Sequence, residues 1–400
     1  MKSRQIYLDH AAATPLDPRA KKAMEPFLDD QYGNPSSFHR TGKIVKDALE
    51  VARDKAALVV GAIGDEIIFT SGGTESDNLA ILGFARANKE HGRHIITVKT
   101  EHPAVLQAAK HLEVKEGFEV TYLDVDEDGL VSVEDVLAAL RPETILVSVM
   151  LANNEIGTIA PVAEIGTAIK KHRSKTSSNF PVLHTDACQA VGSLEVNVQK
   201  LGVDLMTVNS SKIYGPKGVG ALYVKRGIKL EPLQFGGHQE RGWRPGTENV
   251  AGIIGFVKAL EIAEAERLGY AEKLISLRDY FIGSILTSIP KTRLNGHKDL
   301  RLPNNVNISF LDIEGEALLL YLDAAGIEAS SGSACTSASL DPSHVILALG
   351  LPFEVAHGSI RFSLGRSTTK KDIDFVLAKL PEVVTKLRQL SPDNVDQKYF

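Results

Sequence analysis

Short apolar runs rich in β-branched residues alternate with helical patterns from Glu66 to Val224. The runs are residues 67–70, 95–98, 120–123, 145–150, 182–185, 205–208 and 219–224. Strands that alternate with helices in this way lie mainly parallel and need helices on both faces of their sheet. The pattern therefore predicts an α/β fold with a mainly parallel sheet.

The elements outside this region indicate a second domain. Helical patterns are expected from Asp17 to about Asp30, over 42–60 and over 249–288. After Pro290 the expected order is strand 306–310, helix 314–325, small-residue loop 330–339, helix 343–349, strand 359–363 and helix 370–387. A chain of 400 residues is long enough for two domains. We expect a large domain over 15–260 and a smaller α+β domain formed by 1–14 and 261–400.

The composition argues against several functional classes. The chain has 45 Lys and Arg residues against 50 Asp and Glu, and its formal net charge of -5 lacks the basic excess of a nucleic-acid binder. The N-terminus has no apolar signal core, and no run approaches a membrane span. We therefore expect a cytoplasmic enzyme with no direct nucleic-acid or membrane partner. Two cysteines, Cys188 and Cys335, exclude a disulfide framework and a Cys-rich metal site.

Polar residues follow several of the predicted strands. In open α/β sheets ligands bind outside the carboxyl ends of the strands. Gly73 and Thr74 follow strand 67–70 in SGGTES, where a helix start favours a phosphate. Thr74 followed by Asp77 also fits a plain helix cap, and both interpretations stay open. His102 follows strand 95–98, and Asn154 follows strand 145–150.

Two more strand ends carry an acid and an amine. Asp186 directly follows a buried strand, where an unpaired carboxylate is costly, so it needs a cationic partner. Lys212 stands in DLMTVNSSKIYGPKGVG, where an apolar run gives way to a polar turn. Pyridoxal 5'-phosphate explains these residues together, because it needs an amine, an acid for its ring nitrogen and a phosphate site. Metal binding is the weaker interpretation, since His102, His184 and Asp186 lack ligand spacing, and nucleotide-binding glycine motifs are absent. We predict no metal site.

Two residues of the C-terminal part complete the candidate site. Cys335 lies in SSGSACTSAS, residues 330–339, whose small polar residues predict an exposed loop and a reactive thiol. Cys188, among alanines and Val191, is expected to be a small core residue. Arg361 interrupts an apolar strand, and its forked guanidinium suits a substrate carboxylate. Pairing with an acid of the protein is the alternative.

With these residues in view, the chain resembles the cysteine desulfurases of the NifS/IscS type, pyridoxal-phosphate enzymes of the class V aminotransferase family. The matching segments are YLDHAAATPLDP near the start, SGGTESDN (71–78), EHPAVL (101–106), NNEIGT (153–158), HTDACQAVG (184–192), KIYGPKGVGALYV (212–224), RPGTENV (244–250), SSGSACTSAS (330–339) and SIRFSLGR (359–366). The resemblance implies the fold-type I architecture, with a mainly parallel seven-stranded sheet and a smaller α+β C-terminal domain. It also implies a desulfurase that converts L-cysteine to L-alanine.

The resemblance assigns a role to each matching residue. Lys212 would form the covalent link to the cofactor, Asp186 would contact its ring nitrogen, and His102 would stack on the ring and move protons. The remaining cofactor contacts would come from Gly73, Thr74, Asn154, Gln189, Asn209, Ser211 and Thr247.

Substrate binding and sulfur transfer are assigned in the same way. Asn154 and Arg361 would bind L-cysteine, and Cys335 would take its sulfur as a persulfide. Thr247 would reach across from a second subunit, which implies a homodimer. The sulfur would pass to an acceptor protein, an iron-sulfur scaffold or a tRNA-thiolation protein.

The chain departs from the family beside Lys212. The family usually has Ser-x-His-Lys there, and this chain has Asn209 and Ser211 in place of the serine and histidine. Because Asn and Ser still donate hydrogen bonds, we expect phosphate binding to be retained but weaker. An aminotransferase or a selenocysteine lyase on the same fold is the enzymatic alternative, and a non-catalytic scaffold subunit is the alternative from another class.

Overall fold

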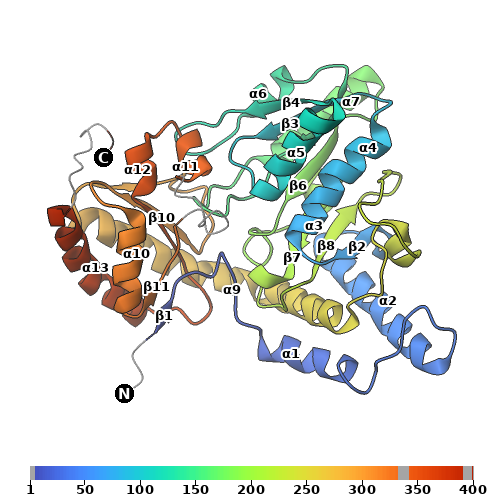
Figure 1. Cartoon of the computed structure of the whole chain (residues 1–400), viewed down its shortest axis with the longest axis horizontal. Helices are drawn as coiled ribbons and strands as arrows, with labels where there is room; N and C mark the ends of the chain where they lie inside the picture. The colour runs from blue at the N-terminus through green and yellow to red at the C-terminus, as the bar shows by residue number, and fades with distance from the viewer. Residues whose placement is uncertain (1–4, 332–341, 391–398, 400) are drawn as a thin grey trace.

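The computed structural model describes residues 5–331, 342–390 and 399. Its centre is a seven-stranded sheet in the order β2-β8-β7-β6-β5-β3-β4 (Figure 1). The strands are β2 (Ile67–Thr70), β3 (His94–Val98), β4 (Glu119–Leu123), β5 (Thr144–Ser148), β6 (Val182–Asp186), β7 (Leu205–Asn209) and β8 (Gly220–Val224). Only β8 runs antiparallel to its neighbours, β2 and β7. The mainly parallel sheet is confirmed, and the run predicted over 145–150 ends as a strand at Ser148.

Neighbouring residues of each strand pack on opposite faces of the large sheet, because side chains alternate between the two faces. Ile95 and Leu205 belong to one buried cluster, and the next residues along the chain, Ile96 and Met206, belong to another. The helices that accompany this sheet are α3 (Gly73–Asn78), the π-helical turn η3 (Leu79–Gly83), α4 (Phe84–Asn88), α5 (Pro103–Glu116), α6 (Val133–Ala138), α7 (Val162–Thr176) and α8 (Val198–Leu201). Both faces are therefore covered, as the continuous apolar runs require.

The N-terminal helices differ from expectation in length. Helix α1 covers only Pro18–Met24 and passes into the 3-10 turn η1 (Glu25–Phe27). The expected extension to Asp30 is wrong because Pro26 has no N–H to donate and its ring clashes with the preceding turn. Helix α2 (Arg40–Val60) begins two residues before the predicted position, and a 3-10 turn η2 (Gly64–Glu66) leads into β2.

A second core surrounds a three-stranded antiparallel sheet in the order β12-β10-β9. Its strands are β9 (Thr292–Leu294), β10 (Asn305–Phe310) and β12 (Ser359–Ser363), and β1 (Ile6–Tyr7) pairs in parallel with β11 (Ile327–Glu328). The helices here are α10 (Gly315–Ala324), α11 (His344–Ala348), α12 (Phe353–His357) and α13 (Lys370–Leu390). The sequence pattern did not reveal β1, β9, β11 and α12, because two to five residues carry too little periodicity.

The long helix α9 (Val250–Ser288) joins the two cores (Figure 1). Phe256 and Leu260 in its first half pack into the core of the large sheet, whereas Phe281 and Ile285 pack into the core of the small sheet. We propose on this basis a division into 15–260 and 1–14 with 261–400. Among the described residues no helix is both long and apolar enough to cross a membrane.

A buried ion pair fixes the segment after β8 to the edge of the large sheet. The guanidinium of Arg53 on α2 donates to both carboxylate oxygens of Glu240, at 2.8 and 2.7 Å. Glu240, in the 3-10 turn η5 (Gln239–Gly242), also accepts the N–H of Phe69 on β2. Both side chains are more than nine-tenths buried. Removing one charge leaves the other without compensation in a medium of low polarity.

We expect Glu240→Gln to destabilise the protein by about 3–5 kcal/mol, because it strands the Arg53 charge. Urea unfolding followed by circular dichroism measures this difference. The control is Asp124→Asn, which breaks an ion pair to Lys99 between two exposed side chains and should leave the midpoint unchanged. Equal midpoints for wild type and Glu240→Gln would show that the buried pair contributes nothing.

Candidate cofactor and substrate site

Asp186 ends β6 with its side chain almost fully buried at 6% exposure. Its Oδ1 accepts the N–H of Cys188 at 2.8 Å, and its carboxylate also contacts the Cys188 thiol. Neither group carries a full positive charge. A buried carboxylate is stable beside a cation, so the protonated ring nitrogen of pyridoxal phosphate fits this position.

Two further buried acids lie close to Asp186. Burial raises the pKa of Asp77 well above its usual value, and the charge of Asp186 adds to the shift. The pKa of Glu101 is raised by the same two causes, although its Oε1 accepts the N–H of Met150. Burial and the neighbouring Asp186 therefore favour the protonated form of both acids.

His184 lies beneath Asp186 on the same face of β6, because residues two apart on a strand share a face. Its ring is fully buried, with Nδ1 2.9 Å from the Ser148 hydroxyl and Nε2 3.2 Å from the Thr207 hydroxyl. Burial lowers the pKa of His184 to about 4, so the ring is neutral at physiological pH. It thus joins β5, β6 and β7 through neutral hydrogen bonds directly below the acid.

Gly73 opens α3, which follows β2, and its surroundings form a cradle. A Cβ added at Gly73 would lie 2.9 Å from the Cys188 sulfur and 3.6 Å from Nδ2 of Asn209. The first helical bond runs from Ser76 N–H to Gly72 O, so the N–H groups of residues 73–75 lie at the open end of the helix. Such a helix start suits a phosphate, and the phosphate site at Gly73 and Thr74 stays a prediction. The helix cap is Gly72, so the alternative in which Thr74 caps the helix is wrong, and Thr74 is exposed in its first turn.

Asn209 lies over this cradle. Its Oδ1 accepts the N–H of Ser211 at 3.2 Å and caps the 3-10 turn η4 (Ser210–Lys212). Because the oxygen is engaged, the amide directs its Nδ2 donor to the start of α3. The substitution of the family serine by Asn209 therefore keeps a donor at the phosphate cradle. Ser211 contributes its carbonyl oxygen to the N–H and hydroxyl of Thr14.

Residues 9–14 bind three of the predicted site residues. Lys212 Nζ donates to the carbonyl oxygen of Ala12, and Gln189 Nε2 donates to that of Ala11. Asp9 forms an ion pair of 2.9 Å with Arg361. The sequence pattern assigned no contact to this stretch, so its role was missed. The signal that could have found it is the run of small residues in HAAAT, which lets the backbone approach side chains closely.

His102 caps α5, and its Nδ1 accepts the N–H of Ala104 at 3.1 Å. A neutral imidazole that accepts at Nδ1 carries its proton on Nε2. The ring is half-buried at the edge of the sheet that carries Asp186. The fold thus presents His102 at a strand end, as predicted, with a defined tautomer.

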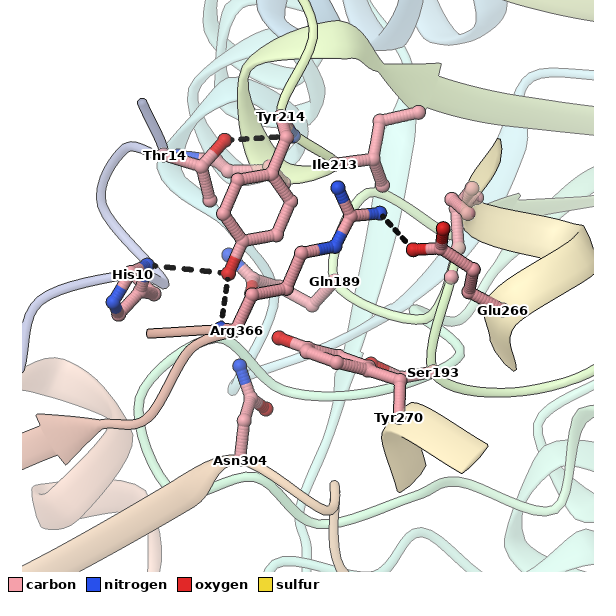
Figure 2. A pocket seen from close by; sticks show the side chains of 14 residues that line it. His10, Thr14, Gln189, Ser193, Ile213, Tyr214, Glu266, Tyr270, Asn304 and Arg366 are labelled. Carbon is pink, nitrogen blue, oxygen red and sulfur yellow. Dashed lines mark hydrogen bonds and ion pairs between the residues drawn. The ribbon is translucent and has the colours of Figure 1, made fainter. Parts of the chain in front are cut away.

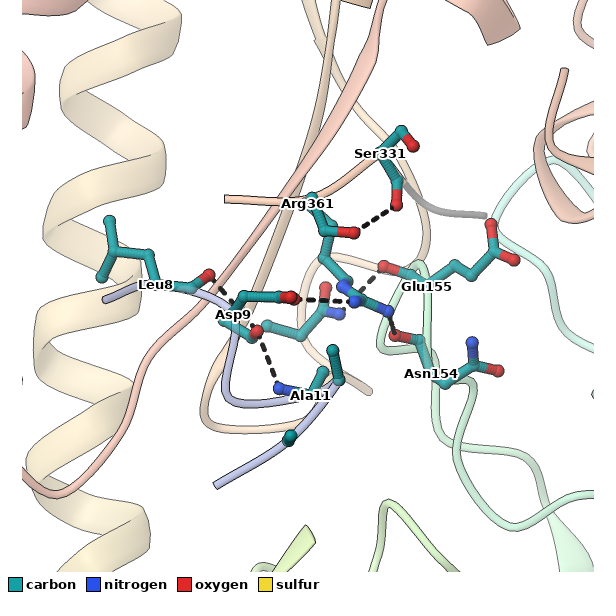
Figure 3. Close-up of polar contacts among 12 residues, drawn as sticks. Leu8, Asp9, Ala11, Asn154, Glu155, Ser331 and Arg361 are labelled. Atoms are coloured by element: carbon teal, nitrogen blue, oxygen red, sulfur yellow. Dashed lines mark hydrogen bonds and ion pairs between the residues drawn. The ribbon is translucent and has the colours of Figure 1, made fainter. Parts of the chain in front are cut away.

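Arg361 on β12 reaches the loop after β5 (Figure 3). Its Nη1 donates to the carbonyl oxygen of Asn154 at 2.9 Å, and its Nη2 pairs with Asp9. The alternative of pairing with a protein acid is therefore observed. Within the described residues the buried Nε has no hydrogen-bond partner, so the guanidinium retains a donor for a substrate carboxylate.

Cys335 falls outside the described residues, and the described residues that precede and follow positions 332–341 are attached at the site. Ser330 exchanges two backbone hydrogen bonds with Arg361. On the far side, the Ser343 hydroxyl donates to Glu155, which follows Asn154. Thr247 is exposed in this single chain, near Arg244, whose guanidinium pairs with Glu75 in the first turn of α3 at 2.9 Å.

The two halves of the candidate cofactor site meet at Cys188. Its sulfur lies against Gly73, its N–H binds Asp186, and Lys212 is close enough to lower the pKa of its thiol. Burial outweighs this effect and raises the pKa of Cys188, which is 7% exposed and, as expected, part of the core. The amine, the acid and the phosphate cradle thus surround one side chain. Among the described residues no group of three His, Cys, Asp or Glu side chains is arranged to hold a metal.

We expect His184→Gln to flatten the fall in stability between pH 6.5 and pH 4. The wild-type ring has a folded pKa of about 4, so the unfolded chain binds one more proton in this window and stability drops by about 3 kcal/mol as the pH falls. Urea unfolding of both proteins at pH 7 and pH 4.5 measures the difference. Parallel pH profiles would contradict the buried neutral ring.

We expect Asn209→Ala to weaken binding of pyridoxal phosphate by about tenfold, because one donor to the phosphate is lost. Titration of the apoprotein with the cofactor, followed by absorbance, gives the dissociation constant. Asn209→Ser, which restores the residue usual in the family, should bind at least as tightly as wild type. Unchanged affinity in Asn209→Ala would exclude the amide from the phosphate site.

Comparison with known proteins agrees with this geometry. The class V aminotransferase family model matches residues 6–376. Cysteine desulfurase IscS of Dictyoglomus turgidum is 53% identical over 390 residues, which cover 97% of each chain. The structure of a NifS-like protein has a TM-score of 0.89 and 36% identity, covering 96% of this chain and all of that one. The structure described as SspA in complex with cysteine has a TM-score of 0.78 and 34% identity, covering 90% of this chain and 99% of that one. The chain therefore belongs to the class V aminotransferase family and, within it, to the NifS/IscS-type cysteine desulfurases.

Proposed function

We propose that this protein is a pyridoxal-phosphate-dependent enzyme that converts L-cysteine to L-alanine and carries the sulfur as a persulfide on Cys335. One observation carries the proposal: the phosphate cradle at Gly73, the buried acid Asp186 and the amine of Lys212 all adjoin Cys188. Relatives named cysteine desulfurase IscS, about half identical over nearly the full length, support it.

The cofactor, when bound, supplies a carbonyl carbon for the amines to join and a ring that draws electrons from the substrate's α-carbon. Lys212 provides the amine that holds it, and Asp186 keeps the proton on its ring nitrogen. The helix start at Gly73 and Thr74 binds the phosphate, together with Asn209 and Ser211. His102 moves protons at Nε2, the nitrogen that carries the proton in the tautomer its Nδ1 contact selects.

The substrate is held by residues of β12 and of the loop after β5. Arg361 binds the carboxylate of L-cysteine through the buried Nε, beside Asn154. Gln189 and Asn154 orient the cofactor and substrate with their amide groups. Ser330, five residues before Cys335, is bonded to the Arg361 backbone, next to the proposed carboxylate site. A thiol on an exposed loop, as the sequence predicts for Cys335, would be suited to deliver sulfur to an outside acceptor.

We also propose the oligomeric state, the sulfur acceptor and the location of the protein. Thr247 lies on an exposed loop and completes the phosphate site of a second subunit, so the working unit is a homodimer. The sulfur passes to an acceptor protein of iron-sulfur cluster assembly or of tRNA thiolation, and the protein works in the cytoplasm. The name IscS of the relatives supports the first of these acceptors.

We expect Lys212→Ala to abolish sulfide release from L-cysteine, because the cofactor loses its amine.

Cys335→Ala should retain bound cofactor and lose at least about 100-fold in alanine formation, because no thiol takes the sulfur. Alanine is followed by chromatography and the persulfide by mass spectrometry of the peptide that contains Cys335.

The matched control is Lys200→Ala, which removes an exposed lysine and should behave as wild type. Undiminished sulfide release by Lys212→Ala would overturn the enzymatic proposal. Full turnover by Cys335→Ala would instead indicate an aminotransferase or a selenocysteine lyase.

A further inference from the structure

Tyr214, two residues after Lys212, is held in an unusual conformation at the junction of the two cores (Figure 2). Its φ is +64°, in the left-handed region that non-glycine residues rarely adopt, and its side chain is buried. Such a conformation costs about 1–3 kcal/mol and persists only where surrounding contacts fix it. The contacts of Tyr214 must therefore fix this conformation.

The backbone of Tyr214 is bound to the N-terminal arm. Its N–H donates to the Thr14 hydroxyl at 2.8 Å, and its carbonyl oxygen accepts the N–H of Asp17 at 2.8 Å. These bonds flank the contact of Thr14 with the Ser211 carbonyl. The segment 211–214, which contains Lys212, is thus fixed from one side.

The side chain of Tyr214 is bound to the other core. Its hydroxyl accepts the N–H of Arg366 at 2.8 Å, bonds to the Tyr270 hydroxyl on α9, and lies 3.5 Å from Nδ1 of His10. The guanidinium of Arg366 stacks over the Tyr214 ring at 4.3 Å from its centre. Figure 2 shows His10 and the backbone N–H of Arg366 meeting at the phenol oxygen, while the Arg366 guanidinium extends past the ring toward Glu266.

Acids hold Arg366 in this stacked position. Its Nη1 pairs with Asp17 at 2.6 Å, and its Nη2 lies 3.4 Å from Glu266 on α9. Hydrogen bonds from Arg19 hold the pKa of Asp17 low, at about 2, so its charge is present throughout the physiological range. Arg366 is thereby fixed in orientation as well as in position.

The stack of Arg366 on Tyr214 connects the two proposed substrate contacts, here called grips: the amine site at Lys212 and the carboxylate site at Arg361. Lys212 is two residues before Tyr214, and Arg361 is five residues before Arg366 on the chain that leaves β12. L-cysteine carries its amino and carboxylate groups on one carbon, so both grips must lie at one short separation. Misplacement by about 1 Å at such a site can cost 100-fold in rate.

We propose that Tyr214 and Arg366 are positioning residues that set the spacing between Lys212 and Arg361, an inference that rests on the proposed function. Neither residue is assigned a contact with the substrate. The stack selects ligands that use both grips at once and is indifferent to ligands that use only the amine site.

Two ligands of the holoenzyme test this spacing. L-alanine has both an amine and a carboxylate, whereas ethylamine lacks the carboxylate, and both are titrated by the visible absorption of the bound cofactor. In Arg366→Lys, which keeps the charge and loses the flat stack, the dissociation constant of L-alanine should rise about tenfold while that of ethylamine stays unchanged. Tyr214→Phe, which removes only the hydroxyl, should show the same selective loss.

The matched control is Arg267→Lys. Arg267 lies on the same helix α9 as Glu266 and pairs with Glu264, at 3.0 Å, outside the stack. Its replacement should leave both affinities unchanged. Equal weakening of the two ligands in both test variants, or no weakening, would overturn the proposal and indicate general stabilisation only. Sulfide release by the wild type is measured separately, so its absence contradicts the proposed function while the comparison of the two ligands still tests the spacing.

Discussion

The hydrogen bonds of residues 9–17 hold the site together. This segment lies between the two cores: Ala11 N–H donates to the Ser363 hydroxyl of the small sheet, and Thr14 and Asp17 bind the segment around Lys212. Three predicted site residues, Lys212, Gln189 and Arg361, donate to it directly. Because most of these partners are backbone groups, the geometry depends on the path of the chain more than on side-chain identity. Loss of this segment would separate the amine from the carboxylate grip.

Several buried ionisable side chains surround Asp186. Burial raises the pKa of Asp77 and Glu101, which favours their protonated forms, and it lowers the pKa of His184 to about 4, so that this ring is neutral. The carboxylate of Asp186 faces the space where a protonated ring nitrogen fits. An interior of low polarity tolerates one matched pair far better than several like charges.

The departure of this chain from its family beside Lys212 has a local explanation. The oxygen of the Asn209 amide caps the 3-10 turn while its nitrogen faces the helix start, so one amide group reaches both places. Asn209 therefore combines a structural contact with a donor to the phosphate cradle. The same turn leads to Tyr214, whose strained backbone is fixed by contacts from both cores. Cofactor binding and domain placement thus share one short segment.

The sequence alone determined the parallel sheet, the strand ends that carry Asp186 and His102, and the small-residue motif that predicts a phosphate site. Apolar periodicity and local turn chemistry act over a few residues, so they can be read directly. Only the tertiary structure decided that Asp9 pairs with Arg361, that Gly72 caps α3 in place of Thr74, and that residues 9–17 bind Lys212. The contacts of residues 9–17 with Arg361 and Lys212 join residues hundreds of positions apart. Their partners depend on how the two cores pack against each other, and no local pattern records that arrangement.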